Sequence, residues 1–152
     1  MTGRVLALAA VLGLATPATA GDLPADEVRP RVEHHLRQAT ELAEHFDAVV
    51  RNGCPRFTTP AQWDAYVDTE MDRVILLAAH VEQAWVEAKA TGDDDIRRAA
   101  KAPRRRLEEA RTLLNKLSTC AEANGATLPT GTLWRQFERE VPRKQAEIAL
   151  PR

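Results

Sequence analysis

The chain has 152 residues, and its 21 lysines and arginines are balanced by 22 aspartates and glutamates, for a formal net charge of -1. This balance argues against a dedicated nucleic-acid-binding protein, which would usually carry a clear basic excess. Apolar residues make up 44% of the sequence and aromatic residues only 5%, which indicates one all-helical domain able to bury a core and not a disordered chain.

Residues 1–20 have the features of a secretory signal peptide. Arg4 supplies the positive n-region, the apolar run from Val5 to Ala15 has the length of an h-region, and Ala18-Thr19-Ala20 fits the cleavage rule. The run is too short to span a bilayer core of roughly 30 Å, and the alternative is a buried N-terminal helix. We expect a mature single-domain chain of residues 21–152, exported to the periplasm or the extracellular space, with no transmembrane segment.

The first two predicted helices have clear boundaries. Apolar residues recur at three- and four-residue steps from about Asp26 to Asn52, and Gly53 is expected to end this helix in a left-handed conformation. The second helix begins with a capping box, in which Thr59 is the cap and Gln62 is the third helical residue. Its apolar stripe continues until Gly92 stops it.

The third and fourth predicted helices each contain a proline. The third is capped by one of the aspartates at 93–95 and ends at Asn124-Gly125, and Pro103 should kink or split it. The fourth begins near residues 130–132 and is kinked or interrupted at Pro142. Short loops between long amphipathic helices favour antiparallel neighbours, so the predicted fold is an all-α, up-down antiparallel four-helix bundle.

The two cysteines test this topology independently. Cys54 follows the first helix and Cys120 lies near the end of the third, so an up-down bundle brings both to one end. Export to an oxidising compartment favours a disulfide between them, which would close a loop of about 67 residues and contribute about 4 kcal/mol. The alternatives are two free buried thiols or pairing between chains.

Most aromatic side chains are expected at the same end of the bundle as the cysteines. They would fill the space beside the disulfide, or alternatively line a pocket for an apolar ligand or a partner peptide. This group contains Phe46, Phe57, Trp63, Tyr66, Trp134 and Phe137, whereas Trp85 belongs to the other half.

The candidate metal ligands are histidines together with neighbouring carboxylates, such as His45 with Glu41. His34, Gln38, Glu41 and His45 share one side of the first helix, but a rise of 1.5 Å per residue separates His34 from His45 by about 16 Å. One ion cannot bind both histidines. The stripe lies away from the apolar face of the helix, so we expect these side chains to be solvated.

Antiparallel packing places His80 of the second helix near the level of His34, where Glu33 or Glu82 would complete a possible metal site. The sequence has no HExxH motif, no histidine pair at i and i+4 and no cysteine cluster, so we expect no metal and no cofactor. His35 differs from the others because it falls at the edge of the apolar stripe, which predicts a buried, hydrogen-bonded side chain.

The densest run of charge is basic and lies in the third predicted helix, mostly opposite its apolar stripe. It suits an anionic surface on a partner, or alternatively it is a solvated face balanced by nearby acids. Those acids are Asp93 to Asp95, Glu108, Glu109 and the acids of the second helix, which are Asp64, Asp68, Glu70, Asp72, Glu82 and Glu87. The basic run consists of Arg97, Arg98, Lys101, Arg104, Arg105 and Arg106.

The sequence contains no constellation typical of catalysis. Ser118 is the only serine and has no histidine near it in sequence, and no glycine-rich phosphate loop occurs. We therefore expect no catalytic residues. The predicted function is that of a non-enzymatic binding protein of the bacterial cell envelope, acting on a protein or anionic partner. The alternatives are a bundle that carries a metal or small ligand and a small secreted helical enzyme.

Overall fold

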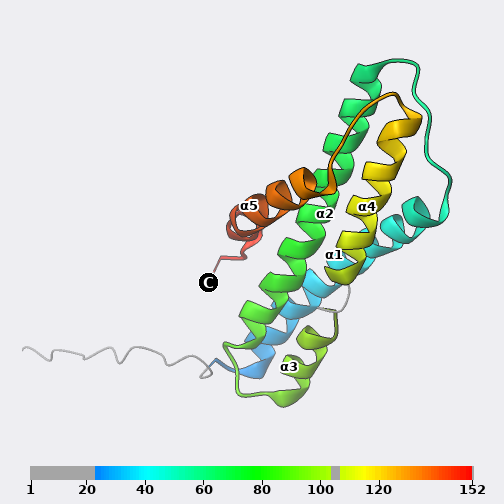
Figure 1. Ribbon diagram of the computed structural model, residues 1–152. Helices are drawn as coiled ribbons and strands as arrows, with labels where there is room; N and C mark the ends of the chain where they lie inside the picture. Colours follow the sequence, from blue (N-terminus) through cyan, green and yellow to red (C-terminus); the bar gives the residue numbers. More distant parts are fainter. Residues whose placement is uncertain (1–22, 104–106, 152) are drawn as a thin grey trace, which may run out of the picture.

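The computed structural model describes residues 23–103 and 107–151. This part of the chain is all-helical and contains five helices: α1 (Ala25–Arg51), α2 (Pro60–Ala88), α3 (Asp94–Lys101), α4 (Leu107–Ala123) and α5 (Thr130–Ile148) (Figure 1). None of the described helices combines the length and apolar character that a membrane span needs. The predicted signal peptide and three residues of the basic run, Arg104, Arg105 and Arg106, lie outside the described residues.

The predicted third helix is two helices, α3 and α4, which is why five helices are present where four were expected. α3 ends at Lys101, shortly before Pro103, whose ring would clash with the preceding turn and which has no N–H to donate. α5 behaves differently, because it continues through Pro142. Of the two outcomes predicted at Pro142, a kink or an interruption, the interruption is therefore wrong.

The predicted helix starts are confirmed. At the start of α2, the Thr59 side chain accepts from the backbone N–H of Gln62, and the Gln62 side chain accepts from the backbone N–H of Thr59. At the start of α3, the Asp93 carboxylate accepts from two backbone N–H groups. The end of α1 differs from the prediction, because the chain leaves the helix at an extended Asn52 and Gly53 has no positive φ.

α2 is the central helix. It contacts each of the other four helices, and more than half of its residues are buried. Figure 1 shows α4 beside the upper part of α2, α3 at its lower end and α5 on its other side. Because α2 is covered on several sides, side chains away from its main apolar stripe are also removed from water.

The buried apolar residues form two clusters. The larger one includes Ala39 of α1 and continues to the disulfide end of the molecule, and the smaller one packs Val28 and Val32 of α1 against the end of α2 and against α3. On α1, the only fully buried residue between the two clusters is His35. A polar layer therefore separates the two apolar parts of the interior.

The predicted disulfide is confirmed. Cys54 and Cys120 are bonded, with their Cα atoms 5.2 Å apart across a sequence separation of 66 residues. The side chain of Asn124 closes the same end, because it donates to the carbonyl of Pro55 at 2.9 Å and accepts from the N–H of Phe57 at 3.0 Å. The end of α1 and the end of α4 meet as the cysteine positions predicted.

Candidate functional site

The described part of the basic run lies on α3. Arg98 and Lys101 are exposed and Arg97 is half-buried. Arg98 forms an ion pair with Asp95 at 3.1 Å between two highly exposed side chains, which contributes little to stability. The first turn of α3 thus balances part of the positive charge of its last turn.

The prediction of a single aromatic end holds for part of the predicted set and is wrong for Trp134. Phe57, Trp63 and Tyr66 cluster near the disulfide, with ring centres 5.3 to 6.3 Å apart. Trp134 instead lies beside Arg111 in the first half of α4, with 5.4 Å between the guanidinium carbon and the ring centre.

The linker between α4 and α5 explains this difference. Residues 124–129 run back from the end of α4 before α5 begins (Figure 1). Six extended residues can span about 20 Å, which exceeds the roughly 14 Å that separates Cys120 from Arg111 along a helix axis. Short-loop reasoning placed the start of the last helix at the disulfide end because it did not allow for this return.

An open surface depression of about 490 Å³ lies where α4 begins. It is lined by Leu107, Glu108, Arg111 and Trp134. The Trp134 ring is stacked on Phe137 with 5.1 Å between ring centres, and its Nε1–H donates to Glu138 at 2.7 Å. The depression therefore combines a held aromatic surface with an exposed guanidinium, directly after the basic run in sequence.

Histidines of α1 and α2 lie close together, because His80 is at the height of His34 along the two helices, as predicted. The ring centres of His34 and His80 are 6.1 Å apart, and His35 and His80 face each other with 2.9 Å between their Nδ1 atoms. His35 is fully buried, as expected, but His80 is only 5% exposed and so is not a solvated side chain. In the described part of the chain, no group of three or more histidine, cysteine or acidic side chains is arranged to hold a metal ion.

Burial keeps the two facing rings neutral. Desolvation, and after it the nearby His34, lower the pKa of His35 to about 4. Desolvation and the neighbouring His35 and His34 lower the pKa of His80 to about 4. At neutral pH one Nδ1 therefore donates and the other accepts, and within the described residues the Nε2 atom of His35 is buried without a hydrogen-bond partner.

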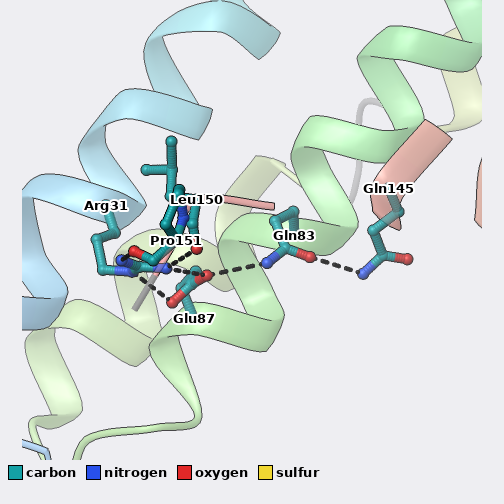
Figure 2. A network of polar contacts seen from close by, with 6 residues as sticks. All are labelled: Arg31, Gln83, Glu87, Gln145, Leu150 and Pro151. Carbon is teal, nitrogen blue, oxygen red and sulfur yellow. Dashed lines mark hydrogen bonds and ion pairs between the residues drawn. The ribbon is translucent and has the colours of Figure 1, made fainter. Parts of the chain in front are cut away.

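A second polar network lies one helical turn from His35 (Figure 2). Arg31 makes a bidentate pair with the buried Glu87, donating from Nε at 2.8 Å and from Nη2 at 3.0 Å. Gln83 donates to the same carboxylate at 2.9 Å and accepts from Gln145 of α5 at 3.2 Å. One carboxylate thereby joins α1, α2 and α5.

Arg31 also holds the end of the described chain. Its Nη2 donates to the carbonyl of Leu150 at 2.6 Å, and its Nη1 donates to the carbonyl of Pro151 at 2.8 Å (Figure 2). The guanidinium therefore binds Glu87 through Nε and Nη2, and it binds the C-terminal tail through Nη1 and Nη2.

Replacing Arg31 with alanine is expected to lower the free energy of unfolding by about 2–3 kcal/mol, because the buried carboxylate of Glu87 loses its charged partner. Denaturant unfolding followed by circular dichroism measures this change. Arg37→Ala, at an exposed position of the same helix, is the control and should change stability by less than about 0.5 kcal/mol. Equal effects of the two variants would show that the Arg31–Glu87 pair does not stabilise the fold.

A third polar group joins α1 and α2 nearer the disulfide end. The carboxylate of Glu70 is 1% exposed, contacts Nε2 of His45 at 2.8 Å and accepts from Arg73 at 2.7 Å. The prediction that Glu70 and Glu87 lie on a solvated face is therefore wrong. His45, which was expected to be solvated, is 36% exposed and bonded to a buried carboxylate.

Sequence reasoning missed these networks because it treated the acids of the second helix as its outer face. A signal was present, since Glu70, His80, Gln83 and Glu87 follow one another at steps of ten, three and four residues and so lie near one side of α2. Glu70, His80 and Glu87 on that side bond to residues of α1, and Gln83 bonds to Gln145 of α5. Polar groups therefore lie among the apolar residues where α1 packs against α2.

Comparison with known proteins identifies no relative: no protein-family model, no curated protein and no solved structure matches this chain.

Proposed function

We propose that this protein is an exported, non-enzymatic helical-bundle protein of the bacterial cell envelope that binds an anionic surface on a partner. The residues that we propose for binding are the cations of α3, those around the depression at Trp134, and the arginines at 104–106, which lie outside the described residues. The architecture that we propose is the up-down bundle, in which α3 and α4 together form its third leg.

The observation that carries the proposal is the pairing of Arg111 with Trp134 at the edge of an open depression. Tryptophan and arginine are the residue types that most often dominate binding energy at protein interfaces. Stacking on Phe137 and the bond to Glu138 hold the Trp134 ring, so little side-chain freedom would be lost on binding.

The surrounding charge supports an anionic partner. Arg97, Arg98 and Lys101 precede the depression in sequence, and three more arginines immediately precede Leu107. A cluster of like charges raises the local concentration of oppositely charged partners and speeds their association. The disulfide supports the proposed compartment, because such bonds persist in oxidising environments.

Binding to two defined probes tests the proposal. The probes are a glutamate-rich peptide that contains one tryptophan and vesicles that contain phosphatidylglycerol. We expect the wild type to bind at least one of them at low salt and to bind it more weakly as salt rises. The variant Arg111→Gln/Trp134→Ala should bind about tenfold more weakly or worse, which corresponds to about 1.4 kcal/mol.

The chain supplies a matched control in Lys89 and Trp85. The Lys89 ammonium lies 5.1 Å from the centre of the Trp85 ring, so this pair has the same chemistry but lies beside the acidic start of α3. Lys89→Gln/Trp85→Ala should leave binding within about twofold of the wild type, about 0.4 kcal/mol. Absence of wild-type binding to both probes, or equal loss in both variants, contradicts the proposal.

A further inference from the structure

The C-terminal tail and the buried histidine pair are neighbours in one polar layer. His35 follows Arg31 by one helical turn on α1, and Glu87 follows His80 by two turns on α2. Figure 2 shows Arg31 placed between Glu87 and the carbonyls of Leu150 and Pro151. The charge of His35 therefore interacts electrostatically with Arg31, the residue that holds the tail.

The charges facing the pair come from α1 and α2. Arg31 and His34 approach it from α1, and Glu87 approaches it from α2. The elements that pack against these helices bury apolar side chains: Ile96 and Ala100 on α3, Leu113, Leu114 and Leu117 on α4, and Leu133 and Phe137 on α5. At neutral pH the layer thus holds one buried carboxylate, one guanidinium and neutral imidazoles.

Uptake of a proton by the pair leaves two cations close to a single carboxylate. The imidazoles cannot move to water, since His35 is fully buried and His80 is 5% exposed. Arg31 is the most exposed member of the layer, with 18% of its side chain accessible, whereas Glu87 has 3%. The least costly response is for Glu87 to turn toward the new charge and for the Arg31 guanidinium to swing outward.

We propose that the His35–His80 pair is an acid-sensitive switch whose protonation frees the C-terminal tail, Leu150 and Pro151, from Arg31. The tail loses its two guanidinium bonds when Arg31 moves, and the helices remain in place because the disulfide and the two apolar clusters do not titrate. This inference does not rest on the proposed binding function.

Backbone relaxation of the full mature chain, measured by NMR between pH 7 and pH 3.5, tests the switch. The order parameter of the Leu150 amide is expected to fall from about 0.85 to below about 0.6 as the histidine rings titrate, while amides in α2 stay rigid. Arg31→Ala supplies the reference for a free tail and should give the low value at every pH.

Asparagine variants separate the histidines from other acid-titrating groups. Asparagine places a neutral polar group near the position of Nδ1, so His35→Asn/His80→Asn should keep the tail ordered through the whole range, because the variant cannot take up a proton at these two positions. His45→Asn is the matched control, because it removes a histidine from the other end of the same helix interface and should retain the acid-induced release. If the double variant does not fold, His80→Asn alone and the ring titration of the wild type give the same test.

Three results would overturn the proposal. The first is a tail that stays ordered in the wild type while both rings titrate. The second is equal loss of tail order in the double asparagine variant. The third is loss of order in α2 together with the tail, which would make the event a global unfolding.

Discussion

The free energy of unfolding is expected to fall steeply as pH decreases from about 6.5 to about 4. The pKa of His35 and that of His80 are both lowered to about 4 in the folded protein, from an ordinary value of 6.5 in the unfolded chain. The unfolded chain therefore binds more protons in this window, so the contribution of these two groups to stability is complete above it and is lost as pH falls through it. The difference corresponds to about 3 kcal/mol for one histidine and up to about 6 kcal/mol for both.

Urea unfolding at a series of pH values measures this dependence. His35→Asn/His80→Asn should flatten the curve between pH 6.5 and 4, and His45→Asn should not. Asp93 titrates below this window, because backbone N–H bonds from Ile96 and Asp95 lower its pKa beneath the ordinary 3.8. A wild-type curve that is flat from pH 7 to pH 4 would mean that the folded protein accepts protons on these rings without cost.

Loss of the disulfide is expected to destabilise the protein by about 4 kcal/mol. The bond joins residues 66 apart in sequence, so breaking it restores a large conformational freedom to the unfolded chain. A change of this size should lower the melting temperature by roughly 10–20 °C for a domain of this length. The folded state should keep its helices, because the larger apolar cluster joins four of them without the bridge.

Thermal and denaturant unfolding of Cys54→Ser/Cys120→Ser, together with the wild type under reducing conditions, measures this effect. If the serine variant and the reduced wild type lose the same free energy of unfolding, the loss comes from the missing covalent link and not from the change of side chain. Cys120 is 1% exposed, so the double variant also buries a hydroxyl, and Cys54→Ala/Cys120→Ala removes that contribution. A loss below about 1 kcal/mol in all three preparations would contradict the loop-entropy argument.

The positions of the helix starts and the disulfide were predictable from the sequence for a local reason. The capping box at Thr59 and the cap at Asp93 depend on residues two to three positions apart, and the chain itself holds these together. The disulfide was predictable for a related reason. The directions of successive antiparallel helices bring the end of α1 and the end of α4 to the same end of the molecule. The same counting placed His80 at the level of His34.

The environment of the charged residues was decided by the tertiary structure. Glu70 and Glu87 have the same pattern as solvated acids, but four helices contact α2 and leave it little free surface. Burial of a carboxylate depends on whether a partner such as Arg31 or His45 reaches it from another helix, and no local pattern records that distance. The place of Trp134 has a similar cause, since it follows from the path of residues 124–129.

By itself, then, the sequence determined the all-helical class, the helix starts and the covalent link between two distant segments, because hydrogen bonds to nearby backbone groups and helix direction act within a short stretch of chain. Tertiary structure alone decided which polar groups are buried away from water. Desolvation depends on everything that surrounds a group, and that sum is complete only once α1, α2 and α5 have packed around His35, Glu87 and the C-terminal tail.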